Sequence, residues 1–389
     1  MGTPGLQQND RVILEREHFP DLLASLHTRG YQVVGPTVRE NAIVYDTLQS
    51  VDDLPIGYTD EQAGGCYRLK KRGDQALFGY AVGPHSWKKF LHLPVLRLWS
   101  AQRTQNGFQI VPEHQEPAKM AFFGVRSCEL HAIAIQDKVF LQMAYHDPAY
   151  QARREHLCLI AVNCGQAGGT CFCASMHTGP KVTSDFDLAL TEILDEHRHS
   201  FLVEVGTALG AEILQDVPCR ATSSEEITQA ERIIADTAAQ MGRTMDTTDI
   251  KDLLYRNTDH PRWEDVASRC LTCGNCTIVC PTCFCTTVED TTDLTGERAE
   301  RWRRWDSCFT TDFSYIVGGS VRASSKARYR QWMTHKLASW IDQFGTSGCV
   351  GCGRCITWCP VGIDITEEVQ AIRESESAPG PGADKERNT

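Results

Sequence analysis

Apolar positions in the first 222 residues alternate between helical spacing and short continuous runs. Residues Phe19–Arg29 have the apolar spacing of an amphipathic helix. Met120–Val125 and Leu157–Val162 are uninterrupted apolar runs of the kind found in buried strands, and Leu130–Leu141 between them again has helical spacing. This alternation predicts an N-terminal α/β domain over residues 1–222, although it does not reveal the order of the strands.

The later pattern is mainly helical. Before it, a β-rich stretch is expected that contains the short apolar run Ala76–Val82. Ser223–Leu254 is charged and has helical spacing, which predicts a helical connector over residues 223–262. Helical character is also expected at Glu297–Trp305 and Lys326–Phe344. Glu297–Trp305 contains glutamates among its arginines, so this segment is interpreted as a solvated helix with its tryptophans turned to the core.

Charge and composition narrow the class of protein. The chain has 389 residues and a net charge of -11, so a nucleic-acid partner is not expected, since phosphates repel an acidic surface. No apolar run is long enough to span a bilayer, and Met1–Asp10 is too polar for an export signal. We therefore expect a cytoplasmic location and no membrane partner. The polar tail 374–389 is expected to be disordered.

Two cysteine runs in the last third of the chain carry the chemistry. Both read C-x2-C-x2-C-x3-C-P, the ligand pattern of bacterial ferredoxins that hold two 4Fe-4S clusters. In this pattern three cysteines on one loop bind one cluster, and the fourth binds the other. We expect Cys270, Cys273, Cys276 and Cys359 on one cluster (the first site), and Cys349, Cys352, Cys355 and Cys280 on the other (the second site). The fold class is therefore α+β: the α/β domain, the connector, and a ferredoxin-like module over residues 263–373 with a long insertion.

Zinc and disulfides explain these runs less well. A structural zinc site usually takes two separated C-x2-C pairs, so the third cysteine and the C-P step would be surplus. A disulfide framework is typical of small secreted domains, and this chain has 18 cysteines in 389 residues.

Four further cysteines suggest a third site. Cys128 and Cys164 each follow a predicted strand, and the carboxyl ends of parallel strands meet at one edge of a sheet. A third 4Fe-4S cluster is one hypothesis, held by Cys128, Cys164, Cys171 and Cys173 (the third site). The alternatives are structural zinc, buried free thiols, or a redox-sensing Cys128 with a pKa lowered by the start of a helix.

The remaining cysteines are interpreted as packing residues. Cys283, Cys285 and Cys308 flank the first motif and are expected to pack beside its cluster rather than bind it. Cys66, Cys158 and Cys219 are isolated in the sequence. The chain contains no dinucleotide-binding glycine motif, phosphate-binding loop or nucleophile elbow, so it can carry electrons without an evident catalytic centre of its own.

Five segments resemble a known family: GVRSCELHAIAIQDKVFL, NCGQAGGTCFCASMHTGP, CLTCGNCTIVCPTCFC, RRWDSC and GCVGCGRCITWCPVGIDI. They are similar to the β subunit of cytoplasmic NAD(P)-linked nickel-iron hydrogenases, or sulfhydrogenases, and to the A subunit of anaerobic sulfite reductase. The resemblance implies a non-catalytic electron-transfer subunit. It would connect the small and large nickel-iron hydrogenase subunits with a flavin subunit that handles NAD(P)H.

Other functions remain open at this point. A sulfite reductase A subunit would instead pass electrons to a siroheme subunit. The α/β domain could itself be catalytic, using Cys128 on a sulfur substrate, or the chain could be a zinc scaffold that joins two partners. The sequence does not distinguish hydrogen, polysulfide or sulfite as the terminal substrate, or NAD from NADP.

Overall fold

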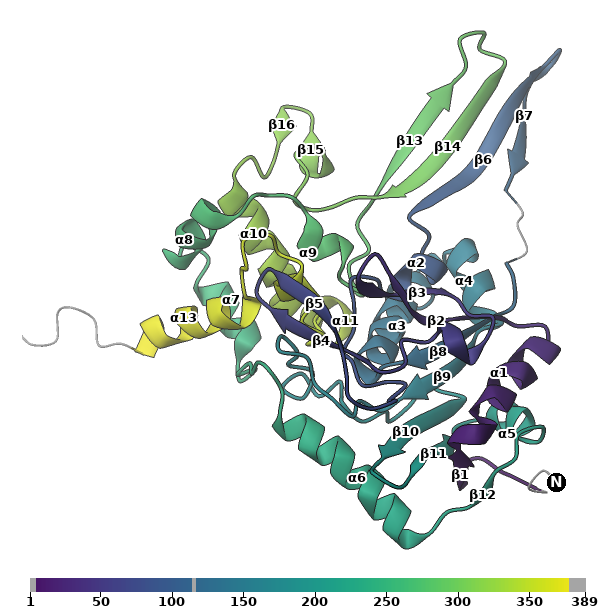
Figure 1. Cartoon of the computed structure of the whole chain (residues 1–389). Coiled ribbons are helices and arrows are strands. Elements are labelled where there is room, and N and C mark those ends of the chain that lie inside the picture. The colour runs from purple at the N-terminus through teal and green to yellow at the C-terminus, as the bar shows by residue number, and fades with distance from the viewer. Residues whose placement is uncertain (1–4, 114–116, 378–389) are drawn as a thin grey trace, which may run out of the picture.

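The computed structural model describes residues 5–113 and 117–377 (Figure 1). Its centre is a mixed sheet made of β1 (Arg11–Glu15), β2 (Gln32–Arg39), β3 (Ala42–Thr47), β8 (Met120–Val125), β9 (Cys158–Val162), β10 (Leu188–Leu194), β11 (His199–Val205) and β12 (Arg220–Ala221). The strand order is β12-β1-β11-β10-β9-β8-β2-β3. The four neighbours β10, β9, β8 and β2 run parallel, and antiparallel strands extend the sheet on both sides.

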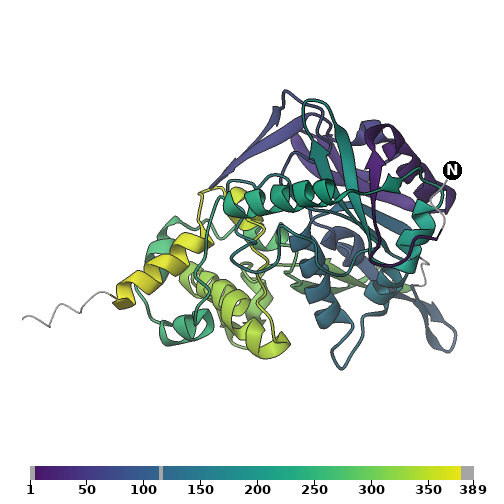
Figure 2. The ribbon, with the colours of Figure 1, turned by 90° about the horizontal axis from the view of Figure 1, so that it is seen from below.

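Helices cover both faces of this sheet, as seen from below in Figure 2. One face packs against α1 (Phe19–Thr28) and α5 (Ala208–Leu214). The other packs against α2 (Lys88–Leu91), α3 (Ser127–Phe140), α4 (Pro148–Glu155) and α6 (Ser224–Ala239). Because β8 and β9 lie between two helical layers, every residue in them is buried, which explains their uninterrupted apolar runs.

The C-terminal part is a cluster of helices around the two cysteine motifs. Its elements are α7 (Ile250–Arg256), α8 (Arg262–Arg269), α9 (Asn275–Ile278), α10 (Ser325–Thr334), the π-helical turn η4 (His335–Ser339), α11 (Trp340–Phe344), α12 (Arg354–Thr357) and α13 (Ile365–Ser377). Trp263, Trp332, Met333 and Leu337 form their shared core. The helix expected at Lys326–Phe344 is confirmed, and helices and mixed sheets together confirm the α+β class.

A four-stranded sheet rises from the body as an arm (Figure 1). It contains β6 (Val95–Thr104), β7 (Gly107–Pro112), β13 (Thr286–Thr292) and β14 (Arg298–Trp305), in the order β13-β14-β6-β7. The two-stranded hairpins β4 (Tyr58–Ala63) with β5 (Cys66–Lys71) and β15 (Tyr315–Ile316) with β16 (Gly319–Ser320) complete the fold.

The helix expected at Glu297–Trp305 is wrong, because this segment forms β14. Its charges are paired across strands: Arg301 bonds Asp290 at 2.7 Å, and Arg304 bonds Glu289 at 2.9 Å. Trp302 and Trp305 are half-buried rather than in the core. The pairing of β14 with β6, which lies about two hundred positions earlier in the chain, outweighs the helical spacing of the segment itself.

Ala76–Val82 is buried but forms no strand. Several of its backbone polar groups are satisfied by side chains instead. The carboxylate of Glu192 accepts bonds from the amides of Leu77 and Phe78 (2.7 and 2.9 Å), while Arg126 donates to the carbonyls of Phe78 and Tyr80 (2.9 and 3.0 Å). This irregular segment therefore reaches the core without a sheet partner.

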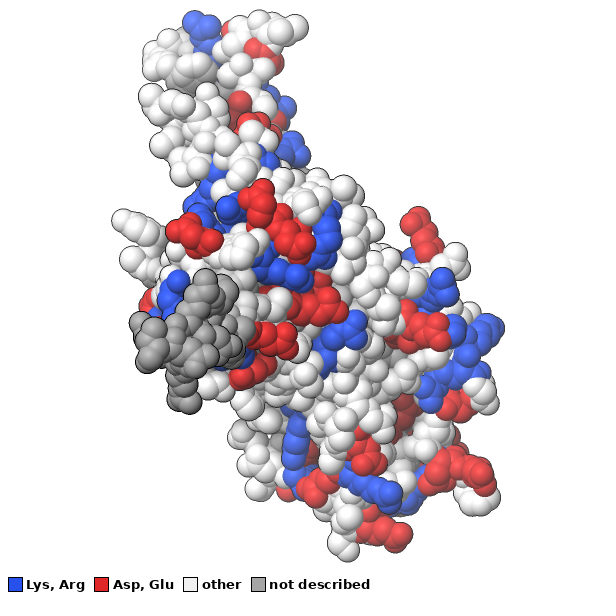
Figure 3. Space-filling model, turned by 90° about the vertical axis from the view of Figure 1, so that its left-hand side faces the viewer, with Lys and Arg blue, Asp and Glu red and all other residues white. Residues whose placement is uncertain are grey.

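Acidic and basic side chains are interspersed on the face shown in Figure 3. Ion pairs among the described residues include Arg256 with Glu376 and Arg373 with Asp249. Within the part of the chain that the structure describes, no helix combines the length and apolarity that crossing a membrane requires.

The N-terminus of α6 depends on the buried carboxylate of Glu226. This carboxylate accepts a bond from the amide of Ser223 (2.8 Å) and pairs with Arg220 (2.6 Å) and Arg198. The bond from Arg220 lowers the pKa of Glu226 from 4.5 to about 2, against the opposing effect of burial. A depressed pKa contributes stability above the unfolded value, which is lost as the pH falls from 4.5 towards about 2.

Glu226→Gln is therefore expected to lower the free energy of unfolding by about 2 kcal/mol at neutral pH. The difference from the unsubstituted chain should shrink as the pH falls below 4.5, because the native carboxyl is then protonated too. Thermal unfolding at several pH values measures this effect. The exposed neighbour Glu225, changed to Gln, is the control and should have little effect, and a pH-independent loss in Glu226→Gln would contradict the prediction.

Candidate functional site

The two cysteine motifs fold as a structural repeat. Thr272 and Gly351 occupy the same position in the two motifs, and both have a positive φ (55° and 64°). This turn brings the amide of Thr272 to 3.4 Å from Cys270 Sγ, and the amide of Gly351 to 3.5 Å from Cys349 Sγ. Amide donors of this kind stabilise negative charge on sulfur, as iron-sulfur clusters require.

The second half of each motif is also repeated. Gly274 and Gly353, with φ of 76° and 73°, immediately precede the short helices α9 and α12, which pack against each other. A further amide, that of Ile363, donates to Cys359 Sγ at 3.3 Å. Because the fourth cysteine follows the short helix, it leaves its own loop and faces the other motif.

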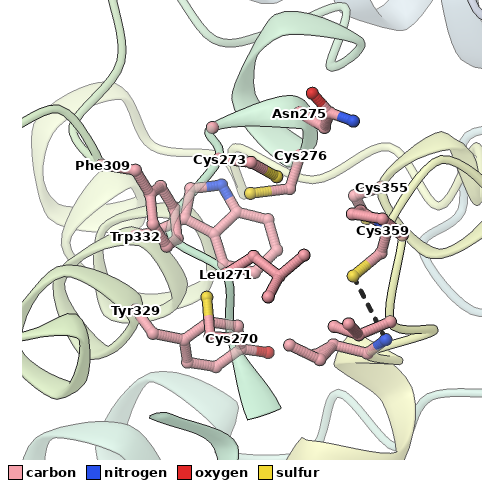
Figure 4. A pocket seen from close by; sticks show the side chains of 14 residues that line it. Cys270, Leu271, Cys273, Asn275, Cys276, Phe309, Tyr329, Trp332, Cys355 and Cys359 are labelled. Atoms are coloured by element: carbon pink, nitrogen blue, oxygen red, sulfur yellow. Dashed lines mark hydrogen bonds between the residues drawn. The ribbon is translucent and has the colours of Figure 1, made fainter. Parts of the chain in front are cut away.

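The first site is brought together around one cavity (Figure 4). Its lining includes Cys270, Cys273, Cys276 and Cys359, which are the four residues expected there. Phe309, Tyr329 and Trp332 form an aromatic wall on one side. Cys273 is exposed, so this site reaches the surface of the molecule. Cys355 of the second motif also lines the cavity, whose other lining is mostly apolar, and the four expected thiols form a donor set that fits a 4Fe-4S cluster.

The second site lies deeper. Cys280, Cys349 and Cys352 are buried, and they lie close enough to Cys355 for the charges of the four sulfurs to act on one another. A hydrogen bond from the thiol of Cys283, together with the charge of Lys336, lowers the pKa of Cys280 well below its usual range.

The third-site cysteines line a separate cavity at the carboxyl edge of the sheet. Cys128 lies in the first turn of α3, after β8, and Cys164 follows β9. The loop after Cys164 brings Cys171 and Cys173 to the same cavity, which Cys352 of the second site also lines. β8 and β9 are parallel neighbours, so their carboxyl ends meet as the sequence predicted.

The loop holding Cys171 and Cys173 packs directly on the second motif. A Cβ added at Gly351 would lie 2.7 Å from backbone atoms of Cys173, and one at Gly353 would lie 2.4 Å from the carbonyl oxygen of Thr170. Only glycine permits this approach at a positive φ.

The expected low pKa of Cys128 is wrong. Burial raises the pKa of this thiol well above its usual value, and the neighbouring Cys173 and Cys352 raise it further. Burial likewise raises the pKa of Cys171 to about 12. Since the loss of water is the largest effect on this thiol and raises its pKa, the interpretation of Cys128 as a redox-sensing thiolate is not supported.

A buried ion pair joins the second and third sites. Glu129, next to Cys128, accepts a bond from Arg354 at 2.6 Å, and both side chains are 1% exposed. The same carboxylate accepts bonds from Tyr45 (2.5 Å) and Trp87 (3.0 Å). Burial alone would lower the pKa of Arg354, but Glu129 and Cys352 hold it well above its usual value. This ion pair is one of the contacts that fix the α/β domain to the ferredoxin-like module, and the pair of Arg303 with Asp147 is another.

Several of these residues were not assigned a role from sequence. Glu129 and Arg354 are visible only as parts of RSCE and GCGRC, and nothing in the sequence places Lys336 beside Cys280. The flanking Cys285 and Cys308 are hydrogen-bonded to each other. Cys158 lies in the core of the sheet, whereas Cys66 and Cys219 are partly exposed. Among the described residues, no three His, Cys, Asp or Glu side chains gather closely enough to hold a single metal ion.

Comparison with known proteins agrees with this geometry. Residues 269–363 match the model of a 4Fe-4S dicluster domain, so the chain is an iron-sulfur protein. Sulfhydrogenase 2 subunit beta of Pyrococcus furiosus is 30% identical over 367 residues, which cover 93% of this chain and 98% of that protein. No solved structure matches the chain. The resemblance in sequence is thereby confirmed: the chain belongs to the family of sulfhydrogenase β subunits, the iron-sulfur electron-transfer subunits of hydrogenase complexes.

Proposed function

We propose that this subunit relays electrons between a nickel-iron hydrogenase module, made of a small and a large subunit, and a flavin subunit that handles NAD(P)H. The complex would be cytoplasmic. In this proposal the first, second and third sites each hold one 4Fe-4S cluster. When bound, such clusters accept and release single electrons.

The observation that carries the proposal is the shared lining of the two cavities. Cys355 of the second site lines the cavity of the first site, and Cys352 lines the cavity of the third site. The second site therefore lies between the other two, and the three sites form a continuous row. A row that starts at the exposed Cys273 and ends inside the α/β domain fits a conduit better than a catalytic centre.

The protein's own contribution is to hold the clusters dry and to stabilise their charge. Burial of Cys280, Cys349 and Cys352 keeps water from the middle of the row. Backbone amides donate to the sulfurs of Cys270, Cys349 and Cys359. Because burial raises the pKa of Cys128, its thiol is protonated and buried when free, which argues against a nucleophilic role on a sulfur substrate.

Purification of the complex through an affinity tag on this chain tests the proposal. Nickel-iron hydrogenase subunits and a flavin subunit should copurify, and NADH or NADPH should bleach the visible absorbance of the clusters under anaerobic conditions. Hydrogen gas should bleach the same absorbance through the opposite end of the row. Copurification with a siroheme subunit instead would identify the sulfite reductase alternative, and a colourless zinc-containing chain would refute the proposal.

A further inference from the structure

Lys336 is buried beside the second site in a specialised helical turn. It lies in the π-helical turn η4, between α10 and α11, and its side chain is 3% exposed. Turns of this type place a side chain differently from the surrounding α-helix and are frequent at functional sites.

The backbone carbonyl and the side-chain ammonium of Lys336 are both hydrogen-bonded to Gly348, the residue before Cys349. Its carbonyl accepts a bond from the amide of Gly348 at 2.8 Å, and its Nζ donates to the carbonyl of the same residue at 3.1 Å. The hydroxyl of Thr282 accepts a bond from Nζ at 3.1 Å and donates to Gly348 at 2.6 Å. The ammonium group is therefore held in one position rather than left free to move.

Nζ also lies 5.9 Å from the centre of the Trp340 ring, and its other contacts are with sulfur. Cys280 Sγ lies at 3.2 Å and Cys283 Sγ at 3.6 Å. No carboxylate pairs with Lys336 among the residues that the structure describes. A buried ammonium without an anionic partner is costly, so the thiolate of Cys280 is its natural counter-charge.

We propose that Lys336 is a positioning residue that raises the reduction potential of the cluster held by the second site. This inference rests on the function proposed above. A cluster with four thiolate ligands becomes more negative when it gains an electron, and a fixed positive charge bonded to one of its sulfurs stabilises that reduced form. Because the second site lies between the other two, Lys336 acts on the middle of the row.

Lys88 provides a matched comparison. It is also buried and near the same segment, but its Nζ donates to the backbone carbonyls of Ile278 (3.3 Å) and Cys283 (3.1 Å) and lies 4.1 Å from the centre of the Trp305 ring. Lys88 donates no bond to a ligand sulfur, although its charge also acts on Cys280, so removing that charge should lower the potential less than removing that of Lys336.

An EPR-monitored redox titration of the anaerobically purified chain tests this inference. In Lys336→Met the ratio of reduced to oxidised cluster at a fixed potential should fall about tenfold for one cluster, which is a downward shift of about 59 mV for a one-electron couple. Lys336→Arg keeps the charge and should restore most of the potential, and Lys88→Met should lower it clearly less than Lys336→Met does, because Lys88 acts on Cys280 without a bond to its sulfur. Iron content should be the same in all variants.

An unchanged potential in an iron-replete Lys336→Met chain would overturn the role of Lys336 while leaving the proposed function intact. Equal shifts in Lys336→Met and Lys88→Met would also overturn it, because the effect would then be that of any nearby charge. If Lys336→Met does not accumulate as a folded protein, Lys336→Gln gives the same readout. Absence of iron from the unsubstituted chain would instead refute the proposed function itself.

Discussion

Glu129→Gln is expected to lower the free energy of unfolding by about 3–5 kcal/mol. The substitution keeps the shape of the side chain but removes its charge, and so leaves the guanidinium of Arg354 buried and unpaired. The bonds from Arg354 to the carbonyls of Gly83 (2.9 Å) and His85 (2.8 Å) do not replace the lost counter-charge. Urea-induced unfolding under anaerobic conditions, followed by circular dichroism, measures the loss.

Two further variants separate the charge from the hydrogen bonds. Tyr45→Phe removes one donor to Glu129 and should cost only about 1 kcal/mol. The double variant Glu129→Leu/Arg354→Met removes both charges and should be more stable than Glu129→Gln alone, since no unpaired charge remains. If Glu129→Gln unfolds at the same urea concentration as the original chain, the pair does not join the two modules energetically.

The third site shows how far sequence reasoning reaches. The apolar runs Met120–Val125 and Leu157–Val162 predicted strands. The strands β8 and β9 that they form are fully buried because helices cover both faces of the sheet. From this it followed that Cys128 and Cys164 lie at one edge of the sheet, and the structure brings them together with Cys171 and Cys173. A rule about parallel strands was enough, because the relevant strands are neighbours in both sequence and space.

Contacts between distant segments could not be predicted in this way. The arm requires β6 to pair with β14, and local spacing in β14 indicated a helix instead. Arg354 meets Glu129 across 225 positions, and Lys336 meets Cys280 across 56. No periodicity encodes such pairs, since they arise only when two folded modules pack together. For the same reason, the presence of Cys352 in the third cavity could not be inferred from its motif.

Removing Cys171 and Cys173 together should lower the iron content from about twelve to about eight atoms per chain. Both side chains line the third cavity, and with both changed to alanine only Cys128 and Cys164 of the four proposed ligands remain there. Iron and acid-labile sulfide, measured on anaerobically purified protein, test this directly. EPR after reduction with dithionite should lose the signal of one cluster and keep those of the first and second sites.

Cys66→Ala is the matched control, because Cys66 lies on β5 and lines neither the first nor the third cavity. That variant should retain about twelve irons. About eight irons in the unsubstituted chain would contradict the prediction and leave the four thiols at the sheet edge as packing residues. The distinction matters for the row of sites, because Cys352 would then face a cavity without a redox group. In that case electrons could enter and leave only through the first and second sites, and the α/β domain would be a docking scaffold rather than part of the conduit.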